Sequence, residues 1–206
     1  MSRVKCFPVQ YARVLAAMVA LALGHAAGTV AAQAGPTFRG DPQAVAEVMS
    51  ALQKFGAARS WRSRMTSPDG TSTATEFVAP DRFRMVLSQG NQTTEIFIIG
   101  RETWTREGGT CTKLPATIPV TNPKDLAEQT GAETITVTRG NPERVDGTPT
   151  QTYTMAVESR GTTTRQKLYV ATATGLLRRI EAQASQGTLL IDYFDYGAPI
   201  TINPPC

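Results

Sequence analysis

The chain has 206 residues, a formal net charge of +4 and a single histidine, His25. Three of its 21 basic residues and none of its 17 acidic residues lie in the first 34 positions, so positions 35–206 carry a formal charge of +1 and give no indication of nucleic-acid binding. Positions 35–206 also lack histidine, which excludes Ser-His-Asp and Cys-His catalysis and the usual histidine-containing zinc sites.

The first 34 residues have the three parts of a secretory signal peptide. The basic residues Arg3, Lys5 and Arg13 precede an apolar stretch at 14–30, and an Ala-Gln-Ala cleavage site ends at Ala34. The stretch is also long enough to be an uncleaved membrane anchor. Its small residues and the cleavage site favour a signal peptide, so we expect residues 35–206 to be exported as a single domain.

One helix is predicted near the start of the exported part. Asp41 is a good N-cap, Pro42 suits the first helical position, and Gly56 can end the helix. Apolar residues between them recur at three- and four-residue spacing, which predicts an amphipathic helix that packs on another element. They are Val45, Val48, Met49, Leu52 and Phe55.

Short runs of alternating residues between turn signals follow, which predicts ten or eleven strands in a meandering antiparallel sheet. A short helix at 124–129, approached by a proline-rich segment, interrupts them. The expected strands are residues 60–66, 72–78, 82–88, 93–99, 102–106, 110–114, 133–138, 151–158, 162–171, 176–184 and 188–196.

Period-two alternation selects apolar side chains that would face one side of this sheet. They either line an apolar ligand cavity or form an ordinary core against the helix. The set is Phe83, Met85, Leu87, Phe97, Ile99, Tyr153, Met155, Val157, Leu189, Ile191 and Tyr193.

The exported part has two cysteines, Cys111 and Cys206. In an oxidising compartment they are expected to form a disulfide, although two free thiols are the alternative. Asp192 and Asp195 are three positions apart on a strand, so we expect them to face opposite sides and not to form a catalytic pair. No motif for a metal, a phosphate or a cofactor is present, and no catalytic residue is predicted.

Three segments are similar to LolA-type periplasmic lipoprotein carriers and their LppX-like relatives. In the first, at 169–181, a Tyr-Val strand is followed by a Thr-Gly-Leu turn and by a strand that starts with basic residues. In the second, at 145–153, an Asp-Gly turn leads into a strand that contains a tyrosine. The third is the closing stretch DYFDYGAPITINPP at 192–205. The order of the expected elements resembles these proteins throughout positions 35–206. Ala171, where many relatives have Asp, and Cys206 depart from the pattern.

The resemblance implies an α+β fold that is mainly β, in which a curved antiparallel half-barrel wraps around the N-terminal helix and a short lid-like helix at 124–129. The alternative for residues 124–129 is a surface crossover loop. The resemblance also implies that Arg62 or Arg64 bonds loop carbonyls and holds this lid closed, the alternative being that both lie on a solvated strand face.

The implied function is non-enzymatic. A periplasmic, monomeric carrier or chaperone would hold the acyl chains of lipids or lipoproteins in the half-barrel, without a cofactor, and would exchange them with a membrane donor or acceptor protein. The alternative is an envelope sensor or interaction module that uses the same fold to bind a membrane or protein partner.

Overall fold

A computed structural model of the chain describes residues 36–115, 134–184 and 187–206. Gly35–Cys206 forms one compact unit, and every described residue belongs to it. The predicted signal peptide and the predicted short helix at 124–129 lie outside the described residues. No helix among the described residues is long and apolar enough to cross a membrane.

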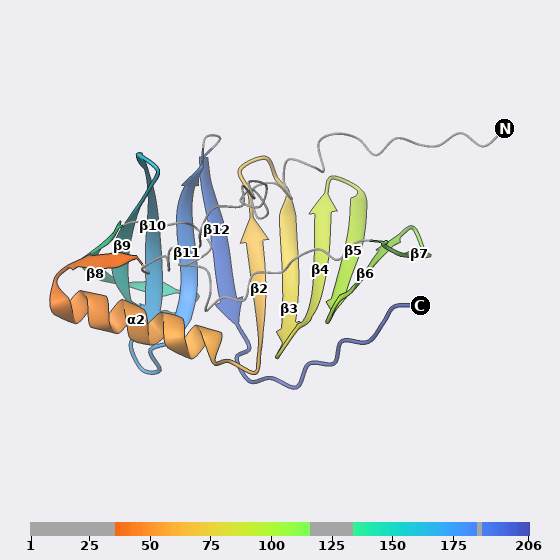
Figure 1. Ribbon diagram of the computed structural model, residues 1–206, viewed down its shortest axis with the longest axis horizontal. Coiled ribbons are helices and arrows are strands. Elements are labelled where there is room, and N and C mark those ends of the chain that lie inside the picture. The colour runs from red at the N-terminus through yellow and green to blue at the C-terminus, as the bar shows by residue number, and fades with distance from the viewer. Residues whose placement is uncertain (1–35, 116–133, 185–186) are drawn as a thin grey trace, which may run out of the picture. The chain divides into compact units, whose positions relative to one another are not determined.

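The helix α2 (Pro42–Gly56) begins and ends where its caps predict. The Asp41 carboxylate accepts hydrogen bonds from the backbone N–H groups of Gln43 and Ala44, both at 3.3 Å, which satisfies donors that the first turn leaves free. One stripe of α2 packs on the sheet (Figure 1). Its fully buried members are Ala44, Val48, Ala51 and Phe55. We call the face of the sheet that packs with these residues the inner face, and the opposite face the outer face.

Twelve strands of the described chain form one sheet. Their bounds are β1 (Thr37–Gly40), β2 (Ser60–Thr66), β3 (Ser72–Val78), β4 (Arg82–Gln89), β5 (Gln92–Ile99), β6 (Glu102–Glu107), β7 (Thr110–Lys113), β8 (Thr134–Val145), β9 (Thr148–Ser159), β10 (Thr162–Ala171), β11 (Leu177–Ala184) and β12 (Gly187–Phe194).

The sheet consists of two antiparallel meanders that meet in its middle. Strands β2 to β7 form one meander and β8 to β12 the other, and β12 pairs with β2. The sheet therefore has open edges at β1 and β7 rather than closing into a barrel (Figure 1). This open, curved arrangement confirms the predicted half-barrel.

The sheet differs from the prediction at one edge. Strand β1 was not predicted, and it pairs with β8 in parallel, which makes the sheet mixed. Strands β8 and β9 are longer than predicted because β8 continues through a register shift between Arg139 and Pro142. The two strands meet at a tight turn in which Asp146 and Gly147 both have positive φ, the conformation of a two-residue hairpin turn.

An aromatic cluster fixes α2 to the centre of the sheet. The Phe55 ring at the end of α2 lies 5.4 Å from that of Trp61 and 4.8 Å from that of Tyr193. Trp61 also stacks on Phe77 at 5.2 Å. Because β2 and β12 are the strands that join the two meanders, this cluster holds the two meanders and the helix together.

Candidate functional site

The inner face carries most of the side chains that alternation selected. Strand register assigns each of them to a face, because directly opposed residues point the same way. On β4, Phe83 lies opposite Phe77 of β3, and both belong to the core that α2 covers. Nine of the predicted residues share this face by cluster or by register: Phe83, Met85, Leu87, Tyr153, Met155, Val157, Leu189, Ile191 and Tyr193.

The prediction was wrong for β5. Phe97 and Ile99 lie on the outer face, and Ile96 and Ile98 take their place on the inner face. The reason is that all four residues of this run are apolar, so alternation cannot tell one face from the other. Register decides the matter, because Ile98 is opposite Phe83 on β4.

The inner face is a closed core next to α2 and a partly exposed apolar surface farther along the strands. Next to α2 the side chains are fully buried. Farther along the strands the apolar side chains pack on that core but remain partly exposed. They are Met85, Leu87, Val157, Ile180 and Ile191, and we call them the inner strip. Partly exposed apolar side chains on a concave sheet can hold an apolar ligand, because a ligand would remove their remaining surface from water.

The polar groups near α2 are paired with one another. The Tyr153 hydroxyl donates a short hydrogen bond to the Glu47 carboxylate, and Arg139 lies 3.2 Å from the same carboxylate. Burial, with the neighbouring Glu47 carboxylate, raises the pKa of Tyr153 well above its usual value. Tyr153 therefore stays protonated at neutral pH and acts as a donor that fastens α2 to β9.

Arg178 on β11 is a polar residue that the sequence analysis missed. Its Nε is buried and has no hydrogen-bond partner among the described residues, whereas the next residue, Arg179, donates to Asp192 at 2.5 Å on the outer face. Burial raises the pKa of the nearby Tyr196 hydroxyl, and the charge of Arg178 opposes that shift. Arg178 is the extra residue of a β-bulge, because Tyr169 of β10 pairs with Arg179 whereas Val170 pairs with Leu177, and no pattern in the sequence indicated this bulge.

The predicted latch arginines lie on the outer face, away from α2. Arg62 is opposite Glu76 on β3 and Phe194 on β12, and its neighbours Trp61 and Ser63 point inward. The Arg62 guanidinium is occupied by two carboxylates, at 2.9 Å from Glu76 and 2.9 Å from Asp195. Both arginines therefore lie on the outer face, and their role as a latch stays a prediction, because the predicted lid at 124–129 lies outside the described residues.

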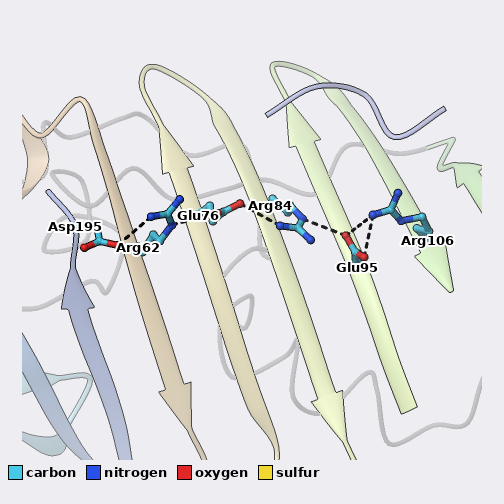
Figure 2. Close-up of polar contacts among 6 residues, drawn as sticks. All are labelled: Arg62, Glu76, Arg84, Glu95, Arg106 and Asp195. Atoms are coloured by element: carbon cyan, nitrogen blue, oxygen red, sulfur yellow. Dashed lines mark hydrogen bonds and ion pairs between the residues drawn. The ribbon is translucent and has the colours of Figure 1, made fainter. Parts of the chain in front are cut away.

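Arg62 is the first arginine of a ladder of ion pairs that crosses five strands of the outer face (Figure 2). Glu76 also pairs with Arg84 at 3.2 Å, and Arg84 pairs with Glu95 at 3.1 Å. Arg106 then donates to both oxygens of Glu95 at 2.9 Å. Burial alone would raise the pKa of Glu95, but the hydrogen bonds from Arg106 and Arg84 outweigh it and lower that pKa.

Asp195 reaches this ladder because the chain turns after β12. The residue has a φ of +53°, and its side chain swings to the outer face, where Asp192 also lies. The expectation that the two aspartates face opposite sides was wrong for this reason. Asp195 pairs with Arg62 and Asp192 pairs with Arg179, so the two aspartates do not form a carboxylate pair.

The C-terminal tail, residues 195–206, covers part of the outer face. Ile202 is buried against Phe97 and Trp104, and Ile200 packs at the edge of the same cluster. Beyond them Cys206 forms a disulfide with Cys111 on β7, with 6.2 Å between the Cα atoms. The predicted disulfide is therefore confirmed.

Solved structures share this arrangement of strands. The lipoprotein LppX of Mycobacterium tuberculosis aligns with a TM-score of 0.60 at 15% identity, over 80% of this chain and 100% of LppX. LprF of Mycobacterium bovis aligns with a TM-score of 0.61 at 15% identity, over 84% of this chain and 99% of LprF. This chain has the LppX-like fold. The resemblance in the sequence is thereby confirmed at the level of the fold.

Other comparisons add little to this likeness. MucB aligns more loosely, with a TM-score of 0.49 at 17% identity, over 79% of this chain and 62% of MucB. No protein-family model matches the chain, and no curated protein matches it.

Proposed function

We propose that the chain is an exported, periplasmic carrier that binds the acyl chains of lipids or lipoproteins on the inner face of its sheet and catalyses no reaction. In this proposal the chain is cleaved after Ala34, and residues 35–206 form a single monomeric domain. The carrier needs no cofactor and exchanges its cargo with a membrane donor or acceptor protein.

The observation that carries the proposal is the inner strip. Its five apolar side chains lie on the face that the sheet curves around, and each keeps part of its surface in water. An acyl chain that covers them gains about 0.8 kcal/mol for each methylene that it buries. Several methylenes therefore give useful affinity without any charged or polar contact.

Two further features support export without catalysis. The Cys111–Cys206 disulfide suits an oxidising compartment, which agrees with the signal-peptide pattern of the first 34 residues. The carboxylate of Glu47 near the inner face is engaged by Tyr153 and Arg139, so its described partners hold it in a structural role.

Neighbouring residues on β12 give a matched pair of variants for the test. Ile191 points to the inner face, whereas Leu190 points to the outer face opposite Thr66 of β2 and Glu181 of β11, and both are partly buried. The change Ile191→Gln places an amide without a partner against a bound acyl chain, which costs about 1–3 kcal/mol. The control Leu190→Gln makes a similar chemical change on the face where no ligand is proposed.

The measurement is titration of each purified protein with a fluorescent fatty-acid probe, together with mass spectrometry of lipids that co-purify with the native protein. We expect saturable binding by the native protein and by Leu190→Gln, with an affinity about tenfold weaker for Ile191→Gln. No saturable binding and no co-purified lipid would refute the proposal. A stoichiometric membrane-protein partner bound without lipid would favour the sensor alternative.

A further inference from the structure

The C-terminal tail connects the middle of the sheet to the strand at one edge. It leaves β12 beside β2, where the Gly197 N–H donates to the Ser60 carbonyl at 3.0 Å and the Ser60 hydroxyl donates to the Ala198 carbonyl at 2.7 Å. Farther on, Arg82 at the start of β4 donates to the Ile202 carbonyl at 2.8 Å. The disulfide then fixes the last residue to β7. The tail thus spans from β2 to β7 on the outer face.

The tail covers an apolar patch that would otherwise face water. Phe97 of β5 and Trp104 of β6 are directly opposed in register, and each is 5% exposed. Ile202 is 3% exposed and closes this cluster from the tail side, with Ile200 beside it. Two large aromatic side chains on an outer face are therefore hidden by a segment that has no strand pairing of its own.

Strand β5 links this covered patch to the inner face. Phe97 and Ile99 pack under the tail, while Ile96 and Ile98, which alternate with them, belong to the inner core. A change in the packing of β5 on one face therefore moves side chains on the other, because one backbone carries both sets. Packed cores respond to such changes by adopting a different arrangement rather than by deforming smoothly.

We propose that the Cys111–Cys206 disulfide is a redox-modification site, and that its reduction by an external protein dithiol releases the tail, loosens β5 to β7 and speeds ligand exchange at the inner face. The last part of this proposal rests on the proposed function. Residue Cys206 is exposed, whereas Cys111 is partly buried at the edge of the cluster under the tail, so we expect a dithiol to attack the Cys206 sulfur.

The reaction is ordinary thiol–disulfide exchange. A thiolate of the reductant attacks the Cys206 sulfur, forming a mixed disulfide and expelling Cys111 as a thiolate, which then takes up a proton. The second thiol of the reductant loses its proton and displaces Cys206 from the mixed disulfide as a thiolate, which takes up the second proton. The protein gains two electrons and two protons in total, and the dithiol leaves as its own disulfide.

Hydrogen exchange, read by mass spectrometry, tests the release of the tail. We expect reduction of the native protein with dithiothreitol to increase amide exchange in the tail, β5 and β6, and to leave β9 and β10 unchanged. The variant Cys206→Ser should exchange like the reduced protein and should not respond to dithiothreitol. Unchanged exchange of β5 and β6 on reduction would overturn the proposal, and the native protein answers this question even if the variant folds poorly.

Dissociation of the fatty-acid probe tests the consequence at the inner face. Couplings between two sites are typically about 5- to 150-fold, so we expect reduction to speed dissociation about fivefold or more. Faster exchange of β5 and β6 with an unchanged dissociation rate would overturn the claim of regulation. If neither redox state binds the probe, the proposed function fails, and hydrogen exchange alone decides whether the disulfide holds the tail.

Discussion

The ladder on the outer face gives a prediction whose size follows from the structure. Glu95 accepts hydrogen bonds from Arg106 with both oxygens at 2.9 Å and from Arg84 at 3.1 Å. The side chain of Glu95 is 19% exposed, but those of Arg84 and Arg106 are 35% and 38% exposed, so solvent screens both pairs. Exposed pairs contribute about 0.2–1 kcal/mol each, and Glu95→Gln should therefore lower the free energy of unfolding by about 1 kcal/mol at pH 7.

The effect of this substitution should depend on pH in a definite direction. The pKa of Glu95 is lower in the folded protein than in the unfolded chain, so its contribution is fully present above the unfolded value, near 4.3. The contribution is lost as the pH falls through the lower, folded value. The difference in unfolding free energy between the native protein and Glu95→Gln should therefore shrink in acid.

Urea unfolding at pH 7 and at pH 3 measures both effects. The control is Glu158→Gln, the same chemical change at an exposed carboxylate on β9. We expect Glu95→Gln to unfold at lower urea than the control at pH 7 and to approach the control at pH 3. Equal stability of the two variants at pH 7, or a gap that widens in acid, would refute the reasoning.

Three other substitutions test separate features. Phe97→Ala empties an outer-face position under the tail and should lower the free energy of unfolding by about 3–5 kcal/mol in a denaturant titration. A loss below about 1 kcal/mol would contradict the burial of Phe97 under the tail. Arg178→Met removes a buried donor that has no partner in the described part of the chain and should raise the free energy of unfolding by about 1 kcal/mol. A loss of that size would mean that Arg178 has a stabilising contact. Gly147→Ala places a side chain on a residue with a φ of +77° at the β8–β9 turn and should lower the free energy of unfolding by about 1–2 kcal/mol, measured by thermal unfolding. An unchanged free energy of unfolding would contradict this turn conformation.

Local signals in the sequence were enough for most of the fold. Asp41 and Pro42 define the start of α2, and the turn glycines separate the strands, because capping and turn conformations depend on nearby residues alone. Strand β1 escaped prediction because it has four residues, only one of which is a large apolar side chain, and because it pairs in parallel with a strand far along the chain. No local pattern reports such a pairing.

The side chains of the candidate site were predicted correctly on β4, β9 and β12 but not on β5. On β4 the alternation of Phe83, Met85 and Leu87 with Arg82, Arg84 and Ser88 identified the inner face correctly. On β5 both faces are apolar, since the tail covers one and the core covers the other, so the choice needed the register with β4. Asp195 was misplaced because its positive φ breaks the alternation at the end of β12.

Photo-crosslinking with a fatty acid that carries a diazirine on its acyl chain tests most directly whether the inner strip holds the ligand. Crosslinked peptides from the native protein, sequenced by mass spectrometry, should carry the label on Leu87, Val157 or Ile191, which point to the inner face. They should not carry it on Val86 or Leu190, their outer-face neighbours on β4 and β12. Labelling concentrated on the inner strip, and competed by unlabelled fatty acid, is the result that we predict. Labelling spread equally over both faces, or undiminished by competitor, would contradict the proposal that this protein carries acyl chains on the inner face of its sheet.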